Sequence, residues 1–377
     1  MDICIIYCNF APRNKSDDNM THNDEAFKQL SHSISCVRFP LVVAILLLHA
    51  YTAAPSLGHG TYFRVLYPFA LWFGETGVPA YFFISGLLMF YSKKTYSQQL
   101  KSRFRSLFIP YMLWNGLFLF AYIVAWKIGF NMEINNKSLA DYNVIDYLRA
   151  FWDRGDWANG NSMPVLTPMW YIRNLMIVYI ISPLVFYVIR ATGLLLFLVA
   201  SLFWINTHNV AFILQTVTMM SLGAYFSIKG INPITFLNKY KILVVIFFVF
   251  FGLGDIFLHQ GIINPNNVFT SDISLPFHRL ALIGNTFIIL LIGSFLYKRG
   301  WHFPNLSKAA FFIFCIHYPL NAAVRSVAKL YPQWPDMVHI LLYVASVAIV
   351  ILICYGLFRI LNRYQPWFIR ISTGGRS

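Results

Sequence analysis

The chain has 377 residues, of which 58% are hydrophobic and only 11% are charged, and its mean hydropathy is +0.58. Once the apolar segments are counted, no soluble domain of useful size remains, so the composition excludes a soluble enzyme and predicts an all-α, polytopic membrane helix bundle. The net charge of +15 would suit nucleic acid, but the placement of the basic residues, described below, argues against that partner. The five cysteines have no metal-binding or redox spacing, and we expect no metal.

Residues 1–36 are mixed polar sequence without an apolar run long enough for a signal peptide. We predict a flexible cytoplasmic tail, with Met20 as an alternative start. The first apolar segment, 37–54, carries Arg38 at its beginning and His49 in its middle, 11 positions later (49 − 38). That separation is about three helical turns and roughly 16 Å of rise, so both side chains can line one face. We expect Arg38 at the inner surface of the membrane and His49 near its midplane.

Nine further apolar segments follow, at 71–91, 107–128, 168–189, 194–205, 210–228, 242–258, 275–297, 309–328 and 337–361. Alternate loops, among them 92–105, 229–241 and 298–308, contain lysine, in two of them with arginine, but no acidic residue. Cytoplasmic loops are enriched in these two residues, so the charges report topology rather than nucleic-acid binding. We predict about ten transmembrane helices with both termini cytoplasmic, a transmembrane domain over 37–361, and a basic cytoplasmic tail over 362–377. The one long loop, 129–167, is acidic on balance and is expected outside.

Several ionisable residues lie within the apolar segments, where they are costly and mark functional sites by default. A neutral imidazole can take a proton from a hydroxyl and return it to a leaving group, so His49 is the candidate general base. A histidine hydrogen-bonded to a neighbouring helix is the alternative. His317 lies at about the depth of His49, and either His317 or Arg173 is a candidate for stabilising an oxyanion. For Arg325 we expect a side chain that snorkels to the surface. For Asp255, a structural hydrogen bond between helices is as good an explanation as a functional role.

Other polar and aromatic residues fall in the outer halves of the predicted helices. Glu75, Trp170 and Arg279 are candidates for binding a substrate in a polar cavity that opens outward and reaches His49. For the tryptophan, an interfacial aromatic belt is the alternative explanation.

The inner face carries the complementary charge. Lys101, Arg103 and Arg105 would gather with Arg38 where the first and third helices begin, and such a cluster suits a phosphorylated ligand such as a nucleotide cofactor. For any one of these residues, topogenic charge with anionic lipid contact is the alternative.

Five motifs occur in order along the chain: the Arg38 and His49 pair, GVPAYFFISGLLMF (77–90), the basic run ending in FIPYMLWN (108–115), MWYIRNLMIVYIISPL (169–184) and LSKAAFFIFCIHYPL (306–320). With them the chain resembles the membrane acyltransferase-3 family. The resemblance implies a multi-pass enzyme that carries an acyl group, usually acetyl from cytoplasmic acetyl-CoA, to a sugar hydroxyl of a polysaccharide or glycolipid precursor. Arg38 and His49 match the family's paired motif. The family's second basic motif usually has two arginines three residues apart, whereas here Arg103 is followed by Arg105, with Ser106 at the expected place.

We hypothesise that Arg38 and Arg103 hold the CoA phosphates and that the thioester arrives beside His49. Whether His49 deprotonates the sugar hydroxyl or itself accepts the acetyl group is open. The leading interpretation is an O-acetyltransferase of the bacterial inner (plasma) membrane, with a carbohydrate or glycolipid acceptor and membrane lipids as its other partners. The alternative is a transporter or flippase of a glycolipid, in which buried histidine and arginine residues form a proton or anion pathway. The acceptor sugar and the oligomeric state stay open.

Overall fold

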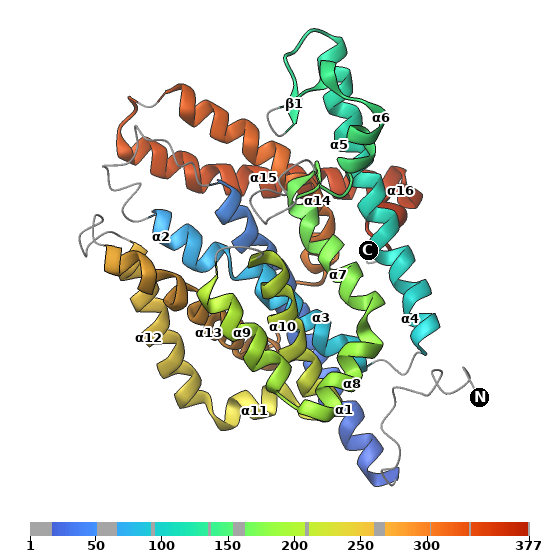
Figure 1. Cartoon of the computed structure of the whole chain (residues 1–377), viewed down its shortest axis with the longest axis vertical. Coiled ribbons are helices and arrows are strands. Elements are labelled where there is room, and N and C mark those ends of the chain that lie inside the picture. Colours follow the sequence, from blue (N-terminus) through green and yellow to red (C-terminus); the bar gives the residue numbers. More distant parts are fainter. Residues whose placement is uncertain are drawn as a thin grey trace.

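The computed structural model describes residues 17–50, 66–91, 95–134, 137–153, 163–207, 211–259, 268–301, 303–331 and 333–375. Within these ranges the chain is helical almost throughout, and its strands are limited to the short antiparallel pair β1 (Glu133–Ile134) and β2 (Lys137–Ser138). Figure 1 shows the helices gathered into one bundle. The predicted all-α helix bundle is therefore confirmed.

The helices fall on all ten predicted apolar segments. They are α1 (Asp17–Ala50), α2 (Tyr67–Phe69), η4 (Ala70–Gly74), α3 (Gly77–Tyr91), α4 (Tyr96–Arg103), η5 (Phe104–Phe108), α5 (Ile109–Lys127), η6 (Leu139–Asp141), α6 (Val144–Arg149), η8 (Thr167–Met169), α7 (Trp170–Ile180), α8 (Ser182–Thr192), α9 (Leu195–Asn206), α10 (Ala211–Ile228), α11 (Pro233–Lys239), α12 (Lys241–His259), α13 (Val268–Lys298), α14 (Pro304–Leu330), α15 (Asp336–Tyr364) and α16 (Pro366–Ser372). Of these, η4 and η5 are single π-helical turns inserted into longer helices, and such turns often occur at functional sites.

Eight helices in the described ranges are long and apolar enough to cross a membrane. The predicted span over 168–189 is broken, because α7 and α8 meet at Ile181 with a bend of 69°. Pro183 occupies the first turn of α8, where it has no N–H to donate back to α7. Helix α9 has 12 residues and so spans about 18 Å, short of the roughly 30 Å of a bilayer core. Ten crossings with both termini cytoplasmic therefore stays a prediction.

The bundle extends beyond both predicted domain boundaries. The boundary at residue 36 lies inside α1, whose membrane-length part begins at Gln29. Leu30, Ile34, Val37 and Leu41 form a buried stripe at helical spacing, so the helix packs as one piece across that boundary.

The predicted basic tail over 362–377 is also largely part of the bundle. Helix α15 continues to Tyr364, and α16 then packs against α5, with Ile369 fully buried (Figure 1). The indole Nε1 of Trp114 donates to the carbonyl of Ser372 at 2.9 Å. Gly374, with φ +63°, lies directly against Ser106 of η5, next to Arg105 of that turn.

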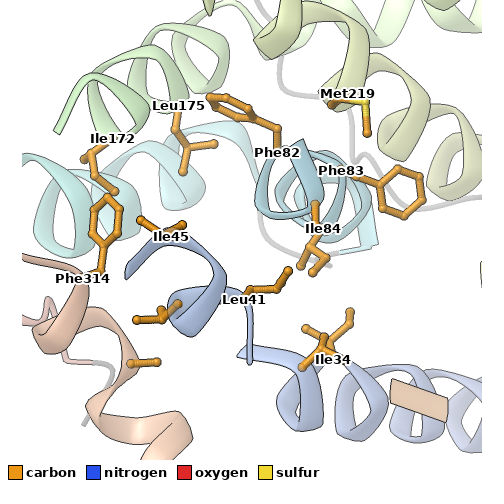
Figure 2. Packing of buried hydrophobic residues seen from close by; sticks show 14 of the residues in the cluster. Ile34, Leu41, Ile45, Phe82, Phe83, Ile84, Ile172, Leu175, Met219 and Phe314 are labelled. Atoms are coloured by element: carbon orange, nitrogen blue, oxygen red, sulfur yellow. The ribbon is translucent and has the colours of Figure 1, made fainter. Parts of the chain in front are cut away.

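Helix α1 is central to the packing and contacts α3, α13 and α14. Figure 2 shows its Leu41 and Ile45 near Ile84 of α3 and Phe314 of α14. Helices α3 and α10 cross where Gly86 faces the Met220 carbonyl, with no room for a Cβ atom. Small residues of this kind allow membrane helices to approach closely.

The loop that follows α5 folds into a small cap with its own apolar cluster of Leu119, Ile134, Leu139, Ala150 and Val165. Asn143 caps α6: its side-chain oxygen accepts a hydrogen bond from the Asp146 N–H, and the Asp146 carboxylate accepts one from the Asn143 N–H. This cap belongs to the acidic loop 129–167, which the sequence predicts to lie outside, and it lies beside α5 (Figure 1).

Candidate functional site

His49 lies in the last turn of α1, and two neighbouring helices fix that turn. Asn321 Nδ2 donates to the Leu46 carbonyl at 3.2 Å, and the Tyr343 hydroxyl donates to the Leu47 carbonyl at 3.0 Å. The His49 ring lies 5.3 Å from the His317 ring, measured between centroids. The structure thus brings together the two histidines that the sequence placed at one depth.

His317 lies near the middle of α14 and is fully buried. Its Nδ1 is 2.7 Å from the Phe314 carbonyl, and because a carbonyl can only accept, Nδ1 carries the proton. Its Nε2 is buried without a hydrogen-bond partner among the described residues. The neutral ring therefore offers a lone pair at Nε2, whereas stabilising an oxyanion from that atom needs an N–H, which only the protonated ring has.

A cation lies next to the histidine pair. The Tyr318 ring is 5.3 Å from the His49 ring, edge to face, and the Arg325 guanidinium lies 5.7 Å from the centre of the Tyr318 ring. Arg325 is half-buried. The spacing of seven residues from Tyr318 to Arg325, about two helical turns, places both on one face of α14 and was the sequence signal for this contact.

The predicted phosphate-binding residues fall into two groups. Lys101, Arg103 and Arg105 are together at the junction of α4 and η5, where Lys101 and Arg105 are exposed and the Arg103 guanidinium lies 4.6 Å from the centre of the Tyr179 ring of α7. Arg38 has an exposed side chain on α1.

Helix α7 links these two groups. The Arg38 carbonyl accepts from the Tyr81 hydroxyl at 2.5 Å, and the Tyr81 ring lies 6.1 Å from that of Tyr171. Tyr171 and Tyr179 are eight residues apart on α7, about 12 Å along its axis. The Arg38 backbone, through Tyr81, and the Arg103 side chain thus approach one helix at different levels, with Arg103 toward its C-terminal end.

Arg173 and Trp170 are buried at the N-terminal end of α7. Arg173 Nη1 donates to the Trp152 carbonyl, and its guanidinium lies 5.3 Å from the Trp152 ring, so Arg173 fastens the cap to α7. Trp170 is 8% exposed and stacks on Phe212 at 4.1 Å, which covers a face of the indole. Their predicted roles, oxyanion stabilisation for Arg173 and substrate binding for Trp170, stay predictions.

Glu75 belongs to a charged bridge that was not predicted from the sequence. His278 Nε2 lies 2.9 Å from Glu75 Oε2, and His278 Nδ1 lies 2.9 Å from Asp255 Oδ2. Arg279, the next residue, points elsewhere: its Nη1 donates to the Thr207 carbonyl at 2.7 Å. The described residues contain no group of three or more His, Cys, Asp or Glu that could hold a metal ion.

Known proteins resemble this chain in sequence. The acyltransferase-3 family model, described as an acyltransferase domain, matches residues 31–359. The succinoglycan biosynthesis protein ExoH of Rhizobium meliloti (strain 1021) is 25% identical over 370 residues, which cover 92% of this chain and 93% of the relative. No solved structure matches the chain.

Proposed function

This chain belongs to the acyltransferase-3 family of integral membrane acyltransferases, and we propose that it moves an acetyl group from cytoplasmic acetyl-CoA to a hydroxyl of a cell-envelope polysaccharide or glycolipid. A relative named for succinoglycan biosynthesis supports a carbohydrate acceptor. The proposed location is the bacterial inner membrane, where acetyl-CoA lies on one side and envelope carbohydrate on the other.

The observation that carries this proposal is the contact between His49 and His317 in the bundle interior, with Arg38 on the same helix as His49. The rise between Arg38 and His49, roughly 16 Å, is comparable to an extended pantetheine arm. A CoA molecule whose phosphates bind Arg38, Arg103 and their basic neighbours can therefore present its thioester beside the histidines.

The reaction needs a base for the hydroxyl proton and a donor for the oxyanion. His49 takes the proton from the acceptor hydroxyl, whose oxygen attacks the thioester carbonyl. The C–S bond then breaks, and the thiolate leaves and is protonated from the imidazolium. The lone pair at His317 Nε2 makes this ring a second proton acceptor. Arg325, whose guanidinium lies over the Tyr318 ring, then joins the predicted Arg173 as a candidate donor for the oxyanion. A route through acetyl-His49 needs the same groups.

Acetyl-CoA binding and turnover by detergent-purified protein test the proposal. We expect turnover by the wild type, CoA binding without turnover by His49→Ala, and weak CoA binding by Arg38→Ala. His317→Gln keeps a polar side chain without the lone pair at Nε2, and we expect it to lose turnover while retaining CoA binding. If the wild type neither binds nor cleaves acetyl-CoA and the variants behave like it, acetyl transfer from CoA is refuted.

A further inference from the structure

The proposed reaction does not use the bridge formed by Glu75, His278 and Asp255, which we call the carboxylate–histidine bridge. Its members come from three parts of the fold: Glu75 from the joint between η4 and α3, Asp255 from α12 and His278 from α13. Each ring nitrogen of His278 is 2.9 Å from a carboxylate oxygen. An imidazole donates at both nitrogens only when it is protonated, so the geometry is that of an imidazolium between two carboxylates.

The bridge has one open end. The Asp255 side chain is 1% exposed and that of His278 is 11% exposed, whereas 35% of the Glu75 side chain is exposed. Arg279 interacts electrostatically with Glu75, so two cations balance two carboxylates, as a low-dielectric interior requires. The buried end thus orients His278, and the bridge leaves the Glu75 carboxylate at its exposed end, where the oxygens can accept further hydrogen bonds.

This open end lies near the reaction centre. A Cβ atom on Gly74 would stand 2.9 Å from the backbone nitrogen of Leu48, which leaves no gap between this stretch and the last turn of α1. Gly74 precedes Glu75 and Leu48 precedes His49, so the Cα atoms of Glu75 and His49 lie within about 12 Å of one another. One or two sugar residues span that distance.

Unpartnered polar atoms flank the same stretch. Asn285 Nδ2 donates to Thr76 Oγ1 at 2.8 Å and to the Trp72 carbonyl at 3.0 Å. Asn285 Oδ1 and Trp72 Nε1 are themselves buried without a partner among the described residues. Asn285 is 3% exposed, and buried polar atoms of this kind call for a bound polar group such as a hydroxyl.

We propose that Glu75 binds hydroxyl groups of the carbohydrate acceptor, and that Asp255 and His278 are positioning residues that hold its carboxylate. This inference rests on the proposed function and deepens it, because it names the acceptor subsite. A carboxylate accepts strong hydrogen bonds from sugar hydroxyls, and the subsite orients the acceptor toward His49.

The test measures acetyl transfer to octyl β-D-glucoside, a sugar with an alkyl chain, in a sugar-free detergent with acetyl-CoA as donor. We expect Glu75→Gln to raise the KM for the glucoside about 10-fold or more, the equivalent of one lost hydrogen bond to a charged group. Asp255→Asn and His278→Gln raise the same KM by roughly 3- to 10-fold, and combining either with Glu75→Gln adds little, because the residues act as one unit. Glu133→Gln, in the exposed β1 strand, is the matched control.

The KM for acetyl-CoA distinguishes positioning from a general loss of structure. In all three bridge variants we expect it to keep its wild-type value, and Glu75→Asp, which retains the charge, to recover part of the glucoside affinity. An unchanged glucoside KM in Glu75→Gln overturns the inference. So does a parallel loss of thermal stability and of donor and acceptor binding, or a proton flux in liposomes that depends on Glu75.

Direct glucoside binding without donor, measured by saturation-transfer NMR, separates the two proposals. If the wild type does not use acetyl-CoA but binds the glucoside more tightly than Glu75→Gln, the acceptor subsite stands and the donor assignment fails. If the wild type transfers acetyl from acetyl-CoA but binds the glucoside no more tightly than Glu75→Gln, the donor assignment stands and the acceptor subsite fails.

Discussion

The crossing of α3 and α10 allows a test in which one substitution has opposite effects at different sites. A Cβ atom on Gly86 would lie well under 3.0 Å from the Met220 carbonyl, and one on Gly223 equally close to the Phe83 carbonyl. Both obstacles are backbone, so the helices must move apart, and overpacking of this kind costs about 1–3 kcal/mol. Gly356 of α15 has nothing within 4 Å of the added atom, so alanine there gains about 1 kcal/mol of helix propensity.

We therefore expect Gly86→Ala and Gly223→Ala to lower the unfolding temperature and Gly356→Ala to raise it. The assay is heating in detergent with a maleimide dye that reacts with the thiols of Cys36, Cys315 and Cys354, which are buried in the folded chain. The double variant at the crossing is expected to cost little more than either single one, because the first alanine already separates the helices. Equal shifts for Gly86→Ala and Gly356→Ala would refute the close crossing.

Two further predictions concern the inner and outer faces. In Gly374→Ala the added Cβ atom would stand 2.5 Å from Ser106. We expect this variant to displace the C-terminal segment from η5, which carries Arg105, and to raise the KM for acetyl-CoA. Gly375→Ala, also at positive φ but with nothing within 4 Å of the added atom, is the control. In the cap, the hydrogen bond from Lys137, with the backbone of Asn143, holds the pKa of Asp146 below its usual range. A lowered carboxyl pKa contributes stability above the unfolded value, near 4, and loses it as pH falls through the folded value. In the wild type, protection of the amides of 144–149 from hydrogen exchange is therefore expected to drop in acid. In Asp146→Asn it is expected to be low already at neutral pH, and equal protection of the two proteins at neutral pH would contradict this.

The position of each helix along the chain was predictable because apolar runs are local in the sequence. The break at Ile181 was less so, since proline alone does not decide it: Pro40, Pro276 and Pro319 all lie inside unbroken helices. In membrane helices neighbouring groups can satisfy the backbone that proline frees, so the outcome depends on packing that the sequence does not state. The helical ends beyond 37–361 were missed for a related reason: packing against the bundle, rather than hydropathy, holds them.

Depth could be counted from the sequence, but rotation about the helix axis could not. His49 and His317 were matched by depth alone, and their rings are in contact. His278 and Arg279 have nearly the same depth but point about 100° apart on α13, and only one of them meets Asp255.

A signal for the carboxylate–histidine bridge was nevertheless present in the sequence. Asp255 and His278 each lie three residues from the end of their predicted segments, 242–258 and 275–297, on either side of one loop. Consecutive membrane helices joined by a loop run antiparallel, so residues equally far from that loop reach equal depth. An embedded carboxylate needs a partner that can carry positive charge. Charge complementarity at matched depth in α12 and α13 therefore predicts the contact between Asp255 and His278, and the same count can find buried charged pairs in other helix bundles of this kind.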